Sequence, residues 1–357
     1  LNPLPTSRPS SICVIGAGVV GFSVAWHLQR SGHQVTLFDP QLGQAQGADA
    51  GSSAALGLLM ARVFRRSSGR GWRLRQQSHA LWRQWREELQ QRGHVLPFRP
   101  GLLQLATTAA EQEAQAQLAE QRQDLRLLDP AELETLRPLI PQPSLGGLLS
   151  PEDGQLDPIP AMRALQEDGA RLGVQLNATA VRGLERSGSG QWRVVGGQGS
   201  YDWVVLSAGL SSSALLEPLG HERPQHPVLG QALELQLADG DQAPLNWPGS
   251  LSWSGINLVP RPQGRLWLGA TVEIDQRQGQ PEQLLALREL DGQAPAWLQR
   301  ATVLRQWQGL RARPLGRPAP LLEQLEPGLL LASGHYRNGV LLAPATAAWV
   351  AEQIEQG

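Results

Sequence analysis

The sequence of 357 residues contains no lysine, because each of its 31 basic residues is arginine. Without lysine there can be no Schiff base to pyridoxal phosphate or to a carbonyl substrate, and no phosphate loop of the Walker type. The net charge is −1, so no overall field draws the chain to nucleic acid or to a membrane surface. We expect small-molecule partners, no nucleic acid and no membrane span, and a homo-oligomer stays open.

Cysteine is almost absent, since Cys13 is the only one in the chain. A single cysteine excludes an internal disulfide, and its place in the apolar run 12–15 predicts a buried structural thiol. A reducing cytoplasm fits this cysteine usage. The seven histidines include no close pair with the spacing of metal ligands, so we expect no metal.

The clearest motif that is present is a glycine turn, Gly16-Ala-Gly18-Val-Val-Gly21, between an apolar strand and an amphipathic helix. Gly16 permits the tight turn, Gly18 lets the backbone approach a pyrophosphate, and Gly21 lets helix and strand pack closely. The next strand ends in Asp39, which can accept hydrogen bonds from a ribose. With the N–H groups of the helix start, this pattern predicts a dinucleotide site.

A second glycine turn, Gly334-His-Tyr-Arg-Asn-Gly339, links the last predicted strand to a closing helix over 340–354. A helix start at this place can hold the far end of a long cofactor. Its N-terminal amides would stabilise the negative charge of a reduced flavin ring. The turn therefore favours FAD over NAD.

A chain of this length exceeds what one hydrophobic core usually organises. The strand–helix–strand start predicts an α/β, Rossmann-like FAD-binding domain. Alternating apolar runs between 226 and 275 predict the antiparallel sheet of an α+β substrate domain. We expect the two domains to be interleaved, with the FAD-binding domain at 1–90, 145–220 and 310–357 and the substrate-binding domain at 91–144 and 221–309.

Six segments spread over nearly the whole chain carry a family resemblance: Gly16-Ala-Gly18-Val-Val-Gly21 with Asp39, Gly51-Ser-Ser-Ala-Ala55, Pro151-Glu-Asp-Gly-Gln-Leu-Asp-Pro158, Val204-Val-Leu-Ser-Ala-Gly209, Trp307-Gln-Gly-Leu-Arg311 and Gly334-His-Tyr-Arg-Asn-Gly-Val-Leu-Leu-Ala-Pro344. Together they resemble the D-amino-acid oxidase superfamily of FAD-dependent oxidoreductases. Within it, the chain is similar to the glycine oxidase branch and to sarcosine-oxidase-type enzymes.

This resemblance implies oxidation of a small amino acid or amine to the imine, with hydride transfer from the α-carbon to flavin N5 and reoxidation by dioxygen to hydrogen peroxide. Relatives that attach the flavin covalently use a cysteine near the C-terminal loop, so the FAD here is expected to be non-covalent. The resemblance places further cofactor contacts at Ser52, Ser53, Ala54, Val181, Ala208, Gly209, Arg337, Asn338, Gly339, Val340 and Leu341.

The resemblance also implies that Arg311 holds the substrate carboxylate, which a planar guanidinium can bind through both oxygens. Arg313 is a rival for this role, because relatives usually have arginine followed directly by proline and this chain reads Arg311-Ala-Arg313-Pro314. Asn257 stands where glycine oxidases tend to carry a tyrosine that assists carboxylate binding. We expect Asn257 to donate a hydrogen bond instead.

Several other residues near these motifs have two interpretations. Tyr336 and Arg337 are further catalytic candidates, whereas loop packing against the cofactor explains His335 and Tyr336 equally well. Val272 is expected in the apolar pocket wall. Six arginines allow three interpretations. They form an entrance for an anionic substrate, a docking face for an electron acceptor or, as is commoner for such a cluster, a solvated face stabilised by tryptophan stacking. These residues are Arg62, Arg65, Arg66, Arg70, Arg73 and Arg75.

Three other functions remain open at this point. The first is an FAD-dependent amino-acid dehydrogenase that passes electrons to a quinone or a carrier protein. The second is a nicotinamide-linked dehydrogenase built on the same glycine turn. The third is a redox-silent FAD-binding protein.

Overall fold

The glycine turn 16–21 follows one of the two central strands of a six-stranded sheet. The computed structural model describes residues 9–43, 50–242 and 246–357. In this sheet all neighbouring strands run parallel except β18 and β19, which run antiparallel. The strand order is β18 (Leu321–Glu326), β19 (Leu329–Ser333), β11 (Trp203–Leu206), β1 (Ser11–Ile15), β2 (Gln34–Phe38) and β7 (Gln175–Asn177).

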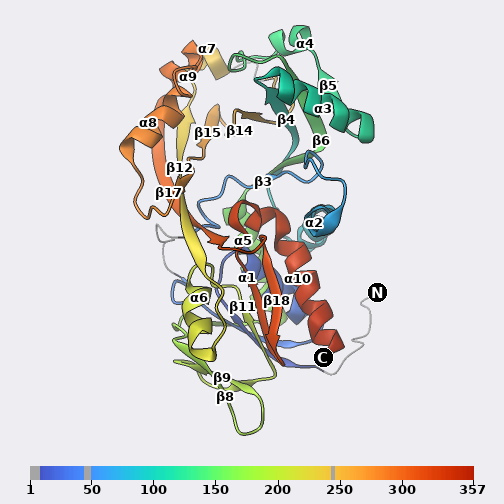
Figure 1. Ribbon diagram of the computed structural model, residues 1–357, viewed down its shortest axis with the longest axis vertical. Coiled ribbons are helices and arrows are strands. Elements are labelled where there is room, and N and C mark those ends of the chain that lie inside the picture. The colour runs from blue at the N-terminus through green and yellow to red at the C-terminus, as the bar shows by residue number, and fades with distance from the viewer. Residues whose placement is uncertain (1–8, 44–49, 243–245) are drawn as a thin grey trace.

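Four helices pack around one another beside this sheet and form the lower lobe with it (Figure 1). Trp26, Trp82 and Trp85 are fully buried between them, because the amphipathic helices turn their apolar faces inward. The indole of Trp26 donates to Asp168 at 2.8 Å, which satisfies a carboxylate that is itself buried. The helices are α1 (Val19–Arg30), α2 (Gly69–Gln91), α5 (Pro158–Leu172) and α10 (Gly339–Gln356).

Two smaller units complete this lobe. A three-stranded antiparallel sheet consists of β8 (Gly183–Arg186), β9 (Trp192–Val195) and β10 (Ser200–Tyr201). The short helix α6 (Ser211–Leu216) follows β11 and leads into the 3-10 turn η1 (Glu217–Leu219).

A ten-stranded sheet forms most of the upper lobe (Figure 1). Its pairs are antiparallel except β13 with β4, which run parallel. The members are β3 (Leu58–Leu59), β4 (Phe98–Ala106), β5 (Arg126–Leu128), β6 (Gly146–Leu156), β12 (Gln225–Gln236), β13 (Ser250–Trp253), β14 (Ile256–Arg261), β15 (Arg265–Gly269), β16 (Glu273–Ile274) and β17 (Thr302–Pro314).

Five helices accompany the ten-stranded sheet, namely α3 (Ala109–Gln121), α4 (Pro130–Glu134), α7 (Asp239–Gln242), α8 (Pro281–Glu289) and α9 (Ala296–Arg300). The two long strands β12 and β17 pair along most of their length and run from the upper lobe down to the lower one (Figure 1). They therefore carry residues of the upper sheet to the junction of the lobes.

The predicted mixed fold, with a Rossmann-like part and an antiparallel part, is confirmed. The domain boundaries stay a prediction. Strand β6 and the whole of β17 pair within the ten-stranded sheet, although the boundaries drawn from the sequence place 145–156 and 310–314 with the FAD-binding parts. Within the described residues no helix is both long and apolar enough to cross a membrane.

Candidate active site

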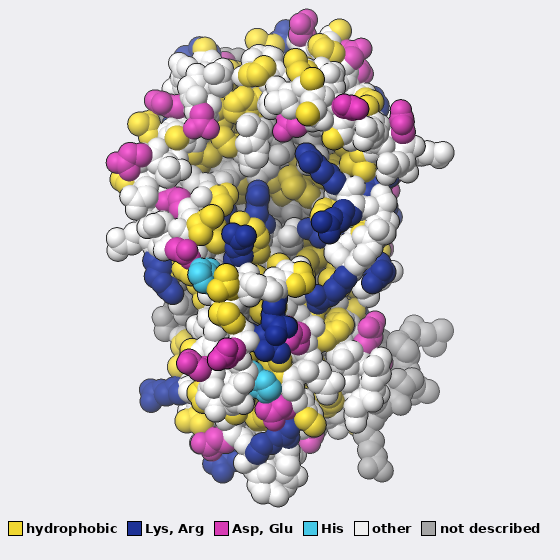
Figure 2. Space-filling model, in the orientation of Figure 1, with side chains coloured by type: hydrophobic (Ala, Val, Ile, Leu, Met, Phe, Trp, Pro, Cys, Tyr) yellow, Lys and Arg dark blue, Asp and Glu magenta, His cyan; other side chains and the backbone are white. Residues whose placement is uncertain are grey.

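A cavity of about 1300 Å³ lies where the two lobes meet. Figure 2 shows it as a hollow with hydrophobic side chains inside and arginine side chains around its rim. Its lining comes from the β1–α1 turn, the loop before β3, the end of β11, the end of β17 and the loop before α10. Segments far apart in the sequence thus face one space.

The β1–α1 turn presents bare backbone to this cavity. Gly16 has φ +106°, and a Cβ there would lie 2.7 Å from the carbonyl oxygen of Ser207. A Cβ on Gly21 would lie 1.7 Å from the carbonyl oxygen of Gly16. Both positions exclude a side chain, because the obstructing atoms are backbone. Gly18 differs, since only the Ser52 side chain lies within 4 Å of a Cβ there.

The carboxylate of Asp39 is held at the edge of the cavity by two backbone N–H groups. Ala17 donates to Oδ2 at 2.7 Å and Gln41 donates to Oδ1 at 2.8 Å. Each oxygen keeps a lone pair that can accept a further hydrogen bond. Val181 also lines the cavity. Asp39 and Val181 therefore offer a hydrogen-bond acceptor and an apolar contact that suit an adenosine.

The loop before β3 connects the start of α1 to β17. The indole of Trp307 donates to the Ala54 carbonyl at 3.0 Å, and a Cβ on Gly51 would lie 2.5 Å from the Leu310 carbonyl oxygen. Ser52 accepts from the Val19 N–H, the first of α1, at 3.0 Å. The loop is therefore fixed between the start of α1 and the strand that bears Arg311.

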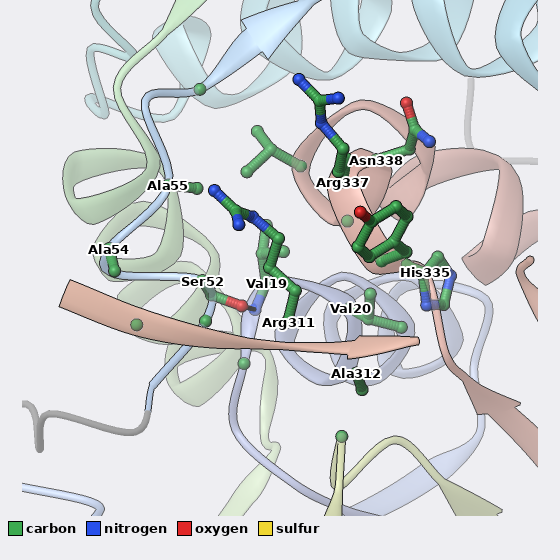
Figure 3. Close-up of a pocket in the computed structure, with 18 of the residues that line it drawn as sticks. Val19, Val20, Ser52, Ala54, Ala55, Arg311, Ala312, His335, Arg337 and Asn338 are labelled. Carbon is green, nitrogen blue, oxygen red and sulfur yellow. Dashed lines mark hydrogen bonds between the residues drawn. The ribbon is translucent and has the colours of Figure 1, made fainter. Parts of the chain in front are cut away.

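Arg311 reaches into the cavity from β17 and meets no carboxylate at salt-bridge distance in the described part of the chain. Its Nη1 donates to the carbonyls of Leu229 at 3.2 Å and Thr271 at 3.1 Å. Burial, and then the charge of Arg337, lower the pKa of Arg311 to about 10, so the guanidinium stays charged at neutral pH. Figure 3 shows Arg311 and Arg337 pointing into the same space.

Gly230 makes room for this guanidinium, because a Cβ there would lie 2.1 Å from Nη2 of Arg311. The side chain of Glu273 lies near this guanidinium and is 6 % exposed. Glu273 accepts from Thr271 Oγ1 at 2.6 Å, from Gln231 Nε2 at 2.9 Å and from the Gln280 N–H at 2.9 Å. Reasoning from the sequence missed Gly230 and Glu273, although an acid that follows the apolar strand β15 so closely is a usable signal.

Arg313 does not line the cavity among the described residues; its guanidinium lies 5.7 Å from the ring centre of Tyr336. Asn257 does line the cavity and is 8 % exposed, and its Oδ1 meets no hydrogen-bond donor among the described residues. The prediction for Val272 is wrong. That side chain is 45 % exposed, because Thr271 and Glu273 turn inward and the residue between them turns out.

The loop before α10 closes the cavity from the other side. Tyr336 has φ +53°, and Arg337 and Asn338 follow it in the 3-10 turn η2 (Tyr336–Asn338). His335 is buried and its Nε2 bonds Thr346 Oγ1 at 2.8 Å. Burial, and then the charge of Arg70, lower the pKa of His335 to about 3. The imidazole is therefore neutral at physiological pH.

Most of the residues predicted for the site line the cavity: Gly16, Gly18, Asp39, Ser52, Ser53, Ala54, Val181, Ala208, Gly209, Asn257, Arg311, Tyr336, Arg337, Asn338, Gly339 and Val340. Gly21 and Leu341 do not line it. Gly21 packs under the turn, and the Leu341 carbonyl accepts from Ser78 Oγ at 2.6 Å in the helical core. Cys13 lies fully buried in β1, where burial raises the pKa of its thiol. No three His, Cys, Asp or Glu side chains within the described ranges are grouped to hold a metal ion.

The family model described as "FAD dependent oxidoreductase", named DAO, matches residues 11–353 of the chain. The chain belongs to this family. FAD is accordingly its cofactor, and the predicted FAD-dependent oxidoreductase is confirmed at this level. The residues fit the cofactor, since the glycine turn leaves backbone bare at a helix start and Asp39 offers acceptor lone pairs beside it.

The chain is similar to glycine oxidase from Bacillus licheniformis, with 28 % identity over 96 % of this chain and 92 % of that protein. It is 31 % identical to the bifunctional protein ThiO/ThiG of Synechocystis sp. over 97 % of this chain, which spans 51 % of that relative. The crystal structure of glycine oxidase from Geobacillus kaustophilus matches with a TM-score of 0.85 and 26 % identity, over 98 % of this chain and 95 % of that one.

Proposed function

We propose that the protein oxidises a small amino acid or amine to the corresponding imine, with dioxygen as the final electron acceptor. The observation that carries this proposal is the position of Arg311. Its guanidinium has no acidic partner among the described residues and faces the same cavity as the glycine turn. The glycine oxidases among the relatives support an amino-acid substrate.

Arg311 would hold the substrate carboxylate. Its Nη1 is committed to two backbone carbonyls, which leaves Nε and Nη2 as a donor edge for both carboxylate oxygens. Because Leu229 and Thr271 fix the guanidinium, the bound carboxylate would fix the orientation of the α-carbon. Asn257 lines the same space and would donate a hydrogen bond to the substrate.

The cofactor would be held by this chain without a covalent bond. The turn 16–18 and the start of α1 would receive the pyrophosphate, Asp39 the ribose, and the loop before α10 the ring system. FAD, when bound, supplies the two-electron acceptor that takes a hydride from the α-carbon and later yields both electrons to dioxygen, giving hydrogen peroxide. His335 is neutral and bonded to Thr346, so it would serve the packing of this loop.

An anaerobic screen tests the proposal directly. The purified yellow protein is mixed without oxygen with glycine, sarcosine, D-amino acids, L-proline and secondary amines, and the flavin absorbance near 450 nm is followed. We expect at least one carboxylate-bearing amine to bleach the flavin, and air to restore the colour with one equivalent of hydrogen peroxide. Failure of every amine to bleach the flavin would overturn the proposal in favour of a redox-silent protein.

The electron acceptor is decided by a second step. Stopped-flow mixing of the reduced protein with air-saturated buffer measures the rate of reoxidation. Reoxidation fast enough to sustain turnover supports the oxidase. Reoxidation much slower than turnover with an artificial quinone would instead identify a dehydrogenase of the same fold.

A further inference from the structure

The described residues that line the cavity carry more positive charge than the two negative charges of an FAD pyrophosphate and one substrate carboxylate would balance. Six arginines line it within the described residues, namely Arg65, Arg66, Arg75, Arg277, Arg311 and Arg337, against the two acids Asp39 and Glu111. Both acids already accept two hydrogen bonds. Glu111 accepts them from the N–H and the hydroxyl of Thr107, at 2.9 Å each. Figure 2 shows arginine side chains around the hollow.

None of these six arginines has a salt bridge to any described acid, although arginines nearby in the chain do. Arg62, at the start of the same segment, lies 2.9 Å from Glu152 and 3.4 Å from Asp124. Arg75 instead stacks on Phe64 at 3.9 Å from the ring centre and donates to the Gly71 carbonyl at 3.1 Å. Its Nε is buried without an acceptor among the described residues.

Arg311 and Arg337 are the two cavity arginines whose positions relative to each other are clearest. They point into the same space (Figure 3), and the charge of Arg337 acts against that of Arg311. Two like charges in a partly desolvated cavity repel each other, and an anion between them relieves that repulsion. A substrate with one carboxylate would neutralise Arg311 and bring no counter-charge to Arg337.

We propose that the preferred substrate carries a second carboxylate, bound by Arg337 with the help of the other cavity arginines Arg65, Arg66, Arg75 and Arg277, in addition to the one held by Arg311. This inference rests on the proposed function, and it narrows the substrate class to small amines with two acidic groups. The glycine turn would hold the cofactor's pyrophosphate with backbone N–H groups and a helix start, so no arginine side chain is needed there. Arg337 lies on the loop that would receive the ring system, and its guanidinium points into the space that Arg311 faces. Steering of a doubly charged substrate into the cavity would follow from the same charges.

Two matched pairs of probes test the proposal. Sarcosine and iminodiacetate are both N-substituted glycines, and they differ only in the carboxylate on the nitrogen substituent. We expect kcat/KM for iminodiacetate to exceed that for sarcosine by about tenfold or more at low ionic strength. Acetate and malonate form the second, non-oxidisable pair. Their dissociation constants, measured by perturbation of the flavin spectrum, should show malonate binding more tightly.

Three charge-neutralising variants identify which arginines cause the preference for a second carboxylate. Arg337→Gln should lower the iminodiacetate-to-sarcosine ratio about tenfold, and Arg75→Gln should lower it several-fold. Arg73→Gln is the matched control, because Arg73 lies on the same helix as Arg75 but is exposed and does not line the cavity. It should leave the ratio unchanged. The same order is expected for the malonate-to-acetate ratio.

The outcomes separate this inference from the proposed function. If sarcosine reduces the flavin as well as iminodiacetate does and malonate binds no more tightly than acetate, the second carboxylate site is wrong while amine oxidation stands. If Arg73→Gln lowers both ratios as much as Arg337→Gln, overall charge and not the cavity causes the preference. If no amine bleaches the flavin, the proposed function fails, and the malonate-to-acetate ratio still decides the anion site.

Discussion

The β1–α1 turn and the end of β17 face the same cavity, but they contribute different parts of the chain to it. The turn offers backbone, shaped by glycines within one run of six residues. Strand β17 offers the side chain of Arg311, which is held by carbonyls 82 and 40 positions away in the sequence. We call the β1–α1 turn the cofactor wall and the end of β17 with Arg311 the substrate wall. The cofactor wall is specified by residues that follow each other in the sequence, whereas the substrate wall depends on how distant strands pair.

This difference implies that the two walls should fail differently when they are mutated. A change at Gly16 or Gly21 meets backbone that has no freedom to move, so cofactor binding and local packing should be lost together. A change around Arg311 acts on a side chain within an intact sheet, so the cofactor should remain and substrate selectivity should be lost. The predictions below test this separation.

The largest effect is expected for Gly21→Val. The new Cβ would lie 1.7 Å from the Gly16 carbonyl oxygen, and backbone overpacking of this kind costs about 1–3 kcal/mol or more. We expect poorly folded protein without FAD, measured as the absorbance ratio at 450 and 280 nm and by thermal unfolding. Gly188→Val is the control, because nothing lies within 4 Å of a Cβ there. Full FAD occupancy in Gly21→Val would contradict the backbone account.

Gly18→Val sharpens the same test. Only the Ser52 side chain, 3.0 Å away, obstructs a Cβ at this position, and a side chain can move. The protein should therefore fold, and FAD should bind far more weakly because the valine fills the space that the pyrophosphate needs. An unchanged dissociation constant for FAD would mean that the pyrophosphate lies elsewhere.

Substitution of Arg311 should give the largest effect on the substrate wall. Loss of a charge-assisted bidentate pair costs about 2–5 kcal/mol, so Arg311→Ala should lower kcat/KM for carboxylate-bearing substrates by roughly 30-fold to several thousandfold. FAD content should not change. Arg313→Ala should lose much less, because Arg313 stacks on Tyr336 and does not line the described cavity. Reversed phenotypes would move the carboxylate site to Arg313.

The contrast between the walls also explains what the sequence could predict. The glycine turn, α1 and Asp39 follow each other along the chain, so spacing alone located them. Arg311 could be placed only by family resemblance, and Gly230 could not be placed at all. Its role depends on the register of β12 against β17, in which Gly230 pairs with Gly309. Val272 was misplaced because it lies in the short link between β15 and β16, where no strand alternation shows which side chain turns inward.

Gly230→Ala tests that register with a smaller change. The added methyl would lie 2.1 Å from Nη2 of Arg311, and the guanidinium is the group that can yield. A displacement of the carboxylate site by about 1 Å should lower kcat/KM about 10- to 100-fold, mostly through KM, with FAD retained. Gly188→Ala is again the control. Unchanged kinetics would mean that Arg311 has room that the packing does not suggest.

The smallest effect concerns His335, which lines the cavity from the loop before α10. The pKa of this imidazole is lowered from the usual 6.5 to about 3 by burial, so between these values the unfolded chain binds a proton that the folded chain does not. Stability should therefore fall as the pH falls from 6.5, and at pH 5 this single group should account for about 1–2 kcal/mol.

His335→Gln should keep the hydrogen bond to Thr346 and remove that share of the acid sensitivity, which shows as a smaller difference in thermal unfolding between pH 7.5 and pH 5. His27→Gln is the matched variant in the lower lobe, because burial lowers the pKa of His27 to about 4. It should act in the same direction, and the two changes should add because the sites share no partner. If His335→Gln left the slope unchanged while His27→Gln reduced it, His335 would be protonated in the folded state at pH 5, as it is in the unfolded chain. The cavity would then hold one more positive charge, and His335 would have to be included in the substrate wall.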